Sequence, residues 1–229
     1  MTIDTVGFDA DDTLWHNERY FHVAQQRFHD LLAEFAEPHT TEEVLLQAER
    51  RNLMLFGYGV KGFVLSMIET AIELSDGAIP ASQLQLIIEQ GKELLAHPVE
   101  LLPYVPEVIG ELASTHRLVL ITKGDLTHQE TKIATSGLAD LFWQIEVVNE
   151  KDPATYSRIL GRHSIDPSSF VMVGNSLRSD ILPVLDIGGR GVHVPYEITW
   201  SMELAVAEDH HDFVSIADLS ELPEVLARW

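Results

Sequence analysis

The chain has 229 residues, of which 45% are hydrophobic and none is cysteine. This length suffices for one large domain or for a core domain with a smaller insert, and the lack of cysteine excludes disulfides and thiolate metal sites. Lys and Arg total 15 against 36 Asp and Glu, which gives a formal net charge of −21. Such a charge repels nucleic-acid phosphates, so we expect no nucleic-acid partner.

The amino terminus, residues 1–7, has no basic region and only a short apolar run, so it does not resemble a signal peptide. No apolar stretch approaches the ~18 residues that are needed to cross a bilayer. We therefore expect no membrane partner and a cytoplasmic location. The sequence makes no prediction about the oligomeric state.

Residues 2–8 predict a short strand that ends directly before Asp9. Apolar residues then recur at helical spacing, with breaks at a proline, a glycine-rich segment and a second turn. The predicted helical stretches lie at about 21–35, 44–54, 63–74 and 83–95. We interpret residues 17–98 as an all-helical insert that follows the first strand.

Beyond residue 98 the pattern alternates between strands and helices. Apolar runs typical of buried parallel strands lie at 118–121, 142–148, 170–173 and 191–194. Helices are predicted at 107–114, 126–136, 154–163, 177–187 and 222–228. This alternation predicts an α/β fold with a doubly wound, Rossmann-like parallel sheet, built from residues 1–16 and 99–229, with helices on both faces.

Polar residues follow four of the predicted strands. Ligands of open parallel sheets bind beyond the carboxyl ends of the strands, so these residues are the candidates for chemistry. They form the segments Asp9-Ala-Asp11-Asp12-Thr13, Thr122-Lys123-Gly124, Lys151-Asp152-Pro153 and Gly174-Asn175-Ser176-Leu177-Arg178-Ser179-Asp180. Together they offer an oxygen nucleophile, hydroxyl and amide donors, a cation and hard metal ligands, which are the groups that phosphoryl transfer needs.

In this order, the segments resemble the four motifs of the haloacid dehalogenase superfamily, and specifically its phosphatase branch. The first motif is Asp-x-Asp-x-Thr, and the second is a strand that ends in Thr or Ser. The third is a lone Lys, and the fourth is a Gly followed by a polar or acidic residue with an Asp further on. The matching residues are Asp9 to Thr13, Thr122, Lys151, and Gly174 with Asn175 and Asp180. Any one motif alone is weak evidence for this resemblance, but the ordered set of four, with a helical insert after the first motif, is specific to the family.

The resemblance implies a role for each of these residues. Asp9 is expected to attack phosphorus and form an aspartyl-phosphate, and Asp11 to protonate the leaving oxygen and then activate water. The expected ligands of a Mg²⁺ ion are the Asp9 side chain, the Asp11 backbone carbonyl, Asp180, and Asn175 directly or through water. The expected phosphate-binding groups are Thr122, the amides of Lys123 and Gly124, and Lys151.

Elementary electrostatics supports the same site. The carboxylates of Asp9 and Asp11 cannot both ionise cheaply without a cation, which Mg²⁺ would supply. Many family members have Asp where this chain has Asn175, which keeps an oxygen ligand but removes a charge. Lys123 competes with Lys151 for the role of the cation, and we favour Lys151. Asp12 is expected to cap the following helix, a role that Asp180 could also have at its own helix start.

Helical inserts act as substrate-selecting caps in this family, so the resemblance implies a small phosphorylated substrate. Lys61, in the segment 57–62, could contact the leaving group, and a solvated lysine on a loop is an equal alternative. Dehalogenase or phosphonate chemistry is disfavoured because those relatives lack the second Asp, whereas phosphomutase chemistry keeps it. A non-catalytic binding protein would be expected to have lost Asp9 or Asp11. The pair His210 and His211 is interpreted as a surface turn rather than a metal site.

Overall fold

The computed structural model describes residues 2–204 and 213–229, so His210 and His211 lie outside the described residues. The chain divides into two compact units, Met1–Glu18 with Val99–Trp229 and Arg19–Pro98, which are described separately below. None of the helices in the described ranges is both long and apolar enough to cross a membrane.

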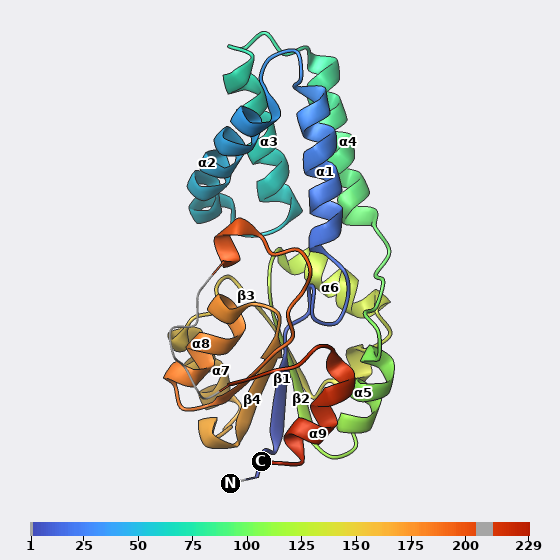
Figure 1. Ribbon diagram of the computed structural model, residues 1–229, viewed down its shortest axis with the longest axis vertical. Coiled ribbons are helices and arrows are strands. Elements are labelled where there is room, and N and C mark those ends of the chain that lie inside the picture. The colour runs from blue at the N-terminus through green and yellow to red at the C-terminus, as the bar shows by residue number, and fades with distance from the viewer. Residues whose placement is uncertain (1, 205–212) are drawn as a thin grey trace. The chain divides into compact units, whose positions relative to one another are not determined.

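Six strands within the described residues of the first unit form one parallel sheet (Figure 1). They are β1 (Thr5–Phe8), β2 (Arg117–Lys123), β3 (Gln144–Val148), β4 (Phe170–Gly174), β5 (Arg190–His193) and β6 (Phe213–Ser215). Their spatial order is β3-β2-β1-β4-β5-β6. The predicted parallel sheet is thus confirmed, with one strand, β6, that was not among the predicted strands. The sequence analysis missed β6 because three residues are too short for a strand pattern to stand out.

The helices of this unit follow the strands. They are α5 (Val105–Leu112), α6 (Leu126–Thr135), α7 (Pro153–Arg162), α8 (Leu182–Asp186) and α9 (Leu222–Leu226). Short 3-10 turns occupy Ala139–Leu141, Pro167–Ser169, Ser201–Glu203 and Leu219–Glu221. The single helix predicted at 177–187 is instead a π-type turn, Leu177–Ile181, followed by α8. Single π turns are frequent at functional sites, and this one carries Asp180.

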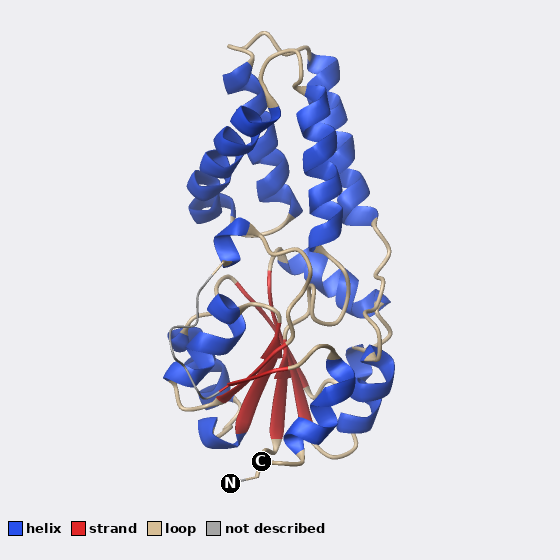
Figure 2. Ribbon diagram, viewed as in Figure 1, coloured by secondary structure: helices blue, strands red, loops and turns tan. Residues whose placement is uncertain are grey.

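Helices cover both faces of the sheet, as predicted (Figure 2). Because successive side chains of a strand point to opposite faces, β2 contributes to two separate cores. Leu118 and Leu120 join the core that contains α5 and α9, whereas Val119 and Ile121 pack with α7. The central strands are therefore buried on both faces, which explains their nearly continuous apolar runs.

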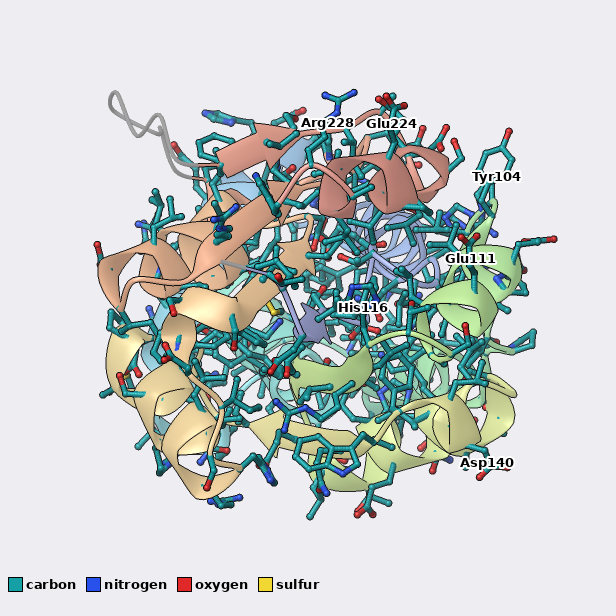
Figure 3. All side chains as sticks on the ribbon, turned by 90° about the horizontal axis from the view of Figure 1, so that it is seen from below. Tyr104, Glu111, His116, Asp140, Glu224 and Arg228 are labelled. Carbon is teal, nitrogen blue, oxygen red and sulfur yellow. The ribbon has the colours of Figure 1, made fainter. Side chains whose placement is uncertain are left out.

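The register of the sheet determines where the first motif, which follows β1, lies relative to the neighbouring strands. Phe8, the last residue of β1, pairs with Leu120 and Val173 on the two neighbouring strands. Asp9 therefore lies at the same edge of the sheet as Gly174 and the last residues of β2. Figure 3 views the opposite end, where the exposed side chains of Tyr104, Glu111 and Asp140 extend away from the sheet.

The described residues of the second unit form helices joined by turns and loops, with no strand. It contains α1 (Glu18–Leu31, which begins at the last residue of the first unit), α2 (Pro38–Phe56), α3 (Val60–Leu74) and α4 (Ala81–Ala96). Phe28, Leu45, Met67 and Ile87, one from each helix, meet in a shared apolar core. The predicted loop 57–62 is shorter than expected because α3 begins at Val60. Lys61 therefore lies in the first turn of a helix, with its side chain exposed.

Candidate active site

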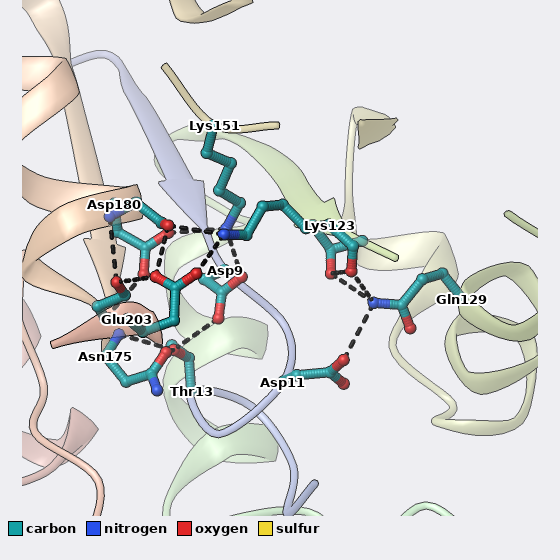
Figure 4. Close-up of polar contacts among 12 residues, drawn as sticks. Asp9, Asp11, Thr13, Lys123, Gln129, Lys151, Asn175, Asp180 and Glu203 are labelled. Atoms are coloured by element: carbon teal, nitrogen blue, oxygen red, sulfur yellow. Dashed lines mark hydrogen bonds and ion pairs between the residues drawn. The ribbon is translucent and has the colours of Figure 1, made fainter. Parts of the chain in front are cut away.

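The Asp9 carboxylate lies at the carboxyl end of β1, the fully buried strand at the centre of the sheet. Its backbone amide donates to the carbonyl of Val173 at 2.9 Å, which continues the β1–β4 ladder. The residue is only 7% exposed. Lys151 Nζ forms an ion pair with Asp9 Oδ1, and Thr13 Oγ1 donates to Oδ2 at 3.1 Å (Figure 4). Both oxygens of this carboxylate are therefore held in place.

Lys151 joins the first motif to the fourth. It follows β3 by three residues, and its Nζ lies 2.7 Å from Asp180 Oδ1 as well as beside Asp9. The Lys151 and Asp180 side chains are 2% and 1% exposed. The other oxygen of Asp180 accepts from the Ser176 amide at 3.0 Å. Three of the residues singled out from the sequence thus meet in one buried cluster.

Gly174 is required by the packing of this cluster. A Cβ atom on Gly174 would lie 2.2 Å from Asp180 Oδ2, far inside van der Waals contact. The carboxylate of Asp180 therefore occupies the space that a side chain would need. The glycine of the fourth motif is explained by this close approach.

The cluster perturbs the pKa values of its members. Burial, and then the charge of Asp180, raise the pKa of Asp9 to about 7 even though Lys151 opposes the shift. Burial disfavours the ammonium form of Lys151, but the charges of Asp180 and Asp9 outweigh it and raise the pKa of Lys151. Asp9 is thus only partly ionised at neutral pH unless more positive charge is added beside it.

Thr13 connects Asp9 to Asn175. The Asn175 amide donates to Thr13 Oγ1 at 3.1 Å, and the same hydroxyl lies 3.3 Å from Asn175 Oδ1. The backbone carbonyl of Asn175 also contacts the His193 ring at 3.0 Å. The side-chain oxygen of Asn175 is thereby placed on the same hydroxyl that orients the Asp9 carboxylate.

Asp11 contacts side chains that the sequence analysis missed. Lys132 Nζ lies 2.6 and 2.7 Å from its two carboxylate oxygens. Trp15 Nε1 donates to Oδ1 at 2.6 Å, and Gln129 Nε2 contacts Oδ2 at 3.0 Å. Burial alone would raise the pKa of Asp11, but the charge and hydrogen bonds of Lys132 outweigh it and lower the pKa. In Figure 4 the Asp11 side chain is directed toward Gln129.

Thr122 is the penultimate residue of β2 and is buried. Its Oγ1 accepts from Gln129 Nε2 at 2.8 Å, the same nitrogen that contacts Asp11. Gly124 follows with φ of 144°, a backbone conformation that other residues rarely adopt. Asp125 then caps α6 by accepting from the His128 amide. This glycine turn lets the chain leave the strand and enter the helix directly.

Lys123 contacts Glu203, a further residue that the sequence analysis missed. Lys123 Nζ lies 2.5 Å from Glu203 Oε1 and 2.8 Å from Ser179 Oγ. Glu203 Oε2 accepts from the hydroxyls of Ser176 and Ser179, both at 2.6 Å. Burial would raise the pKa of Glu203, but Lys123 and the two serines lower it. The side-chain charge of Lys123 is thus balanced by a neighbouring carboxylate.

Asp12 has the structural role that was predicted for it. Its Oδ1 accepts from the Asn17 amide at 2.8 Å, and its Oδ2 accepts from the Glu18 amide at 3.0 Å. These are the free amides at the start of α1, so Asp12 caps that helix. Burial and the charge of Asp11 raise the pKa of Asp12 to about 7.

The charges at the sheet edge suit a divalent cation. Asp9 and Asp180 share one bound ammonium group, which shows that their oxygens converge where a cation can lie. When all are ionised, the carboxylates outnumber the ammonium groups by one in the set Asp9, Asp11, Asp180, Glu203, Lys123, Lys132 and Lys151. Within the described residues, no three His, Cys, Asp or Glu side chains group as a metal site. Two carboxylates with an amide oxygen nevertheless suit Mg²⁺, which keeps several water ligands.

Comparison with known proteins decides the family. The family model for haloacid dehalogenase-like hydrolases matches residues 3–188. The chain belongs to this family. The predicted family and its α/β fold are therefore confirmed, and the protein is a hydrolase.

Solved structures of the family share the fold of this hydrolase. A haloacid dehalogenase-like family hydrolase from Xanthomonas campestris is 47% identical, with a TM-score of 0.90, over 99% of this chain and 91% of that one. A 2-haloacid dehalogenase from Pseudomonas syringae pv. tomato is 28% identical, with a TM-score of 0.67, over the full length of both chains.

A curated relative of this hydrolase is the glyceraldehyde 3-phosphate phosphatase of Pyrococcus furiosus. It is 30% identical over 137 residues, which are 55% of this chain. The match covers 56% of that protein, so the hydrolase spans about half the length of its curated relative.

Proposed function

We propose that this hydrolase is a Mg²⁺-dependent phosphomonoester hydrolase that acts on a small phosphorylated metabolite through an aspartyl-phosphate intermediate. The observation that carries the proposal is the buried Asp9 carboxylate, which follows β1 and is held by Lys151 and Thr13. Asp11 supplies a second carboxylate two residues further along the same turn.

In the proposed reaction, a carboxylate oxygen of Asp9 bonds to phosphorus while the bond from phosphorus to the leaving oxygen breaks. Asp11 gives a proton to the leaving oxygen and later takes one from the water that attacks the aspartyl-phosphate. Thr122 and the two amides that follow it hold the phosphoryl oxygens. The Lys151 ammonium group stays beside Asp9 and offsets the charge of the incoming phosphate.

The proposed Mg²⁺ ligands are the side chains of Asp9, Asp180 and Asn175 and the backbone carbonyl of Asp11. When bound, Mg²⁺ supplies positive charge that keeps Asp9 ionised and offsets the charge of the phosphate. This agrees with the raised pKa of Asp9, which needs such a charge at neutral pH. The HAD hydrolase YfnB of Bacillus subtilis, whose fold is similar with a TM-score of 0.71 at 18% identity, has a crystal structure with bound magnesium.

A dehalogenase is the second candidate, because the Pseudomonas syringae relative is a 2-haloacid dehalogenase that matches the whole chain. Asp11 favours the phosphatase. An ester formed from a haloacid is opened by water without a leaving alkoxide to protonate, so the second carboxylate has no task there. The Pyrococcus furiosus relative, a glyceraldehyde 3-phosphate phosphatase by name, supports a small phosphorylated substrate.

We further propose that the helical unit Arg19–Pro98 serves as a cap that selects the substrate. Lys61 at the start of α3 is the proposed contact for the leaving group. A cap that limits access favours a metabolite over a phosphoprotein.

The test is a screen of phosphorylated metabolites, with triose phosphates included, and of 2-haloacids, each with and without Mg²⁺. We expect phosphate release that needs Mg²⁺ and no halide release. Asp9→Asn should abolish turnover, and Asp11→Asn should lower kcat about 10²- to 10⁴-fold. Asp140→Asn, at an exposed acid, is the matched control.

Turnover in ¹⁸O-water separates the two candidate chemistries. Water attacks phosphorus in the proposed reaction, so the label should enter inorganic phosphate and leave Asp9 unlabelled. In a dehalogenase, water attacks the carboxyl carbon of the ester, so the label would enter Asp9. Full activity of Asp9→Asn would refute the covalent route.

A further inference from the structure

Helix α6 buries polar side chains where a helix on a sheet usually buries apolar ones. Its buried residues are Gln129, Lys132 and Ile133, at the spacing i, i+3 and i+4 that defines one helix face. The Lys132 side chain is 11% exposed. Burying an ammonium group is unfavourable unless it is paired and hydrogen-bonded. Lys132 is paired with Asp11, 121 residues earlier in the chain.

The hydrogen bonds around Asp11 distinguish its two oxygens. Oδ1 accepts from both Trp15 and Lys132 at 2.6 Å, so both of its lone pairs are used. Oδ2 accepts from Lys132 at 2.7 Å and lies 3.0 Å from Gln129 Nε2. That nitrogen has two hydrogens but three acceptors, since it also lies 2.6 Å from the Lys123 carbonyl and 2.8 Å from Thr122 Oγ1. The contact to Asp11 is the longest of the three, so Oδ2 is bound less tightly than Oδ1.

The same contacts place Oδ2 near the proposed phosphate site. Asp11 Oδ2 and Thr122 Oγ1 both contact Gln129 Nε2, at 3.0 and 2.8 Å, so they lie less than about 6 Å apart. A phosphoryl group held by Thr122 would therefore lie close to Oδ2.

We propose that Lys132 is the positioning residue for Asp11: with Trp15 it anchors Oδ1, and with Gln129 it holds Oδ2 on the side of Thr122 and the proposed phosphate site. This inference rests on the proposed function. In the first step Oδ2 takes the proton that the phosphate monoester brings as a monoanion, and passes it to the leaving oxygen as the bond from that oxygen to phosphorus breaks and the bond from Asp9 to phosphorus forms. In the second step Oδ2 takes a proton from the attacking water, and the bond from phosphorus to Asp9 breaks. Lys132 stays protonated and balances the Asp11 carboxylate formed between the two steps.

The experiment measures kcat/KM for a series of aryl phosphates whose phenols differ in acidity. A positioned acid helps a poor leaving group far more than a good one, so the dependence on phenol acidity reports on the acid rather than on the fold. Lys132→Met should lower kcat/KM about 10- to 100-fold for the least acidic phenol, within the range of general acid catalysis. The loss for 4-nitrophenyl phosphate should be only a few-fold. Lys132→Arg, which keeps the ion pair, should restore the wild-type dependence.

Two further variants keep the test decisive if Lys132→Met is unstable. Asp11→Asn defines the dependence without an acid, and in Asp11→Asn/Lys132→Met no buried carboxylate is left unpaired. If Lys132 acts through Asp11, adding Lys132→Met to Asp11→Asn should leave the dependence unchanged. Lys92→Met removes an exposed lysine of α4 and should match wild type.

The outcomes separate this inference from the proposed function. An equal loss on every aryl phosphate, or no loss at all, overturns the role of Lys132 while the phosphatase stands. If the wild-type protein with Mg²⁺ hydrolyses no member of the series, both proposals fall together.

Discussion

Lys151→Met tests whether one ammonium group holds the two buried carboxylates of the site together. Lys151 contacts both Asp9 and Asp180, and the three side chains are at most 10% exposed. Methionine fills a similar volume but leaves both carboxylates without their partner. Removal of one member of a buried ion pair destabilises a protein by about 3–5 kcal/mol, because the remaining charge is uncompensated.

This loss corresponds to a fall in Tm of about 6–20 °C for a chain of this size. The effect should depend on pH with a defined sign. The pKa of Asp9 is already raised from 3.8 to about 7 with Lys151 present, and removal of the Lys151 charge raises the pKa of Asp9 further. A carboxyl group with a raised pKa favours the folded state at low pH and loses that contribution as pH rises through the folded pKa. The destabilisation should therefore be larger at pH 8 than at pH 5.5.

The assay is metal-free thermal and urea denaturation followed by tryptophan fluorescence. The four tryptophans, Trp15, Trp143, Trp200 and Trp229, all belong to the first unit, so the signal reports on the unit that carries the site. Lys92→Met is the matched control, since an exposed pair contributes at most about 1 kcal/mol. A Lys151→Met protein that melts within 2 °C of the control, or whose destabilisation does not change with pH, would refute the reasoning.

Three further predictions address the metal, the glycine and the second carboxylate cluster. Because Asp9 must be ionised to attack, the acidic limb of the profile of kcat/KM against pH should lie near pH 7 at low Mg²⁺ and move to lower pH as the Mg²⁺ concentration is raised. An acidic limb that does not respond to Mg²⁺ would contradict the proposed effect of the ion on Asp9. Gly174→Ala should displace Asp180, whose oxygen lies 2.2 Å from the added Cβ, and raise the Mg²⁺ concentration for half-maximal activity about 10-fold or more. Gly110→Ala, with open space around the added Cβ, is the control, and equal Mg²⁺ requirements of the two variants would disprove the packing argument. Glu203→Gln should lower the free energy of unfolding by about 1–3 kcal/mol at pH 7. Since the pKa of Glu203 is lowered from 4.5, the difference in unfolding free energy between wild type and variant should shrink as pH falls below that value. A difference that persists at pH 3.5 would exclude the ion pair as its cause.

The sequence predicted the strand ends because each carries a short local signal. Asp9, Thr122, Lys151 and Asp180 each follow an apolar run, and a parallel sheet brings such residues to one edge. The ion pairs of Lys151 with Asp9 and Asp180 show that these three residues do lie together. The central strands could also be predicted from a local signal, since burial on both faces makes each of them a nearly unbroken run of apolar residues.

The partners of those residues could not be predicted, because they are set by long-range packing. Lys132 meets Asp11 across 121 residues, and Glu203 meets Lys123 across 80. The only local sign of Lys132 is a helix face on which Gln129 and Lys132 stand with Ile133. Glu203 lies in a three-residue turn, between Met202 and Leu204, where no pattern distinguishes it from a solvated acid.

The position of the insert has a consequence for how the protein is made. β1 leaves the ribosome before its partner strands, since Thr5 pairs with Arg117 on one side and Phe170 on the other. At 5–20 residues per second, roughly 5 to 30 s pass before these partner strands are synthesised. The helices between them have local contacts and can fold during this interval. The strand that leads to Asp9 is therefore synthesised before both strands that enclose it, so the nascent chain must keep it from pairing elsewhere.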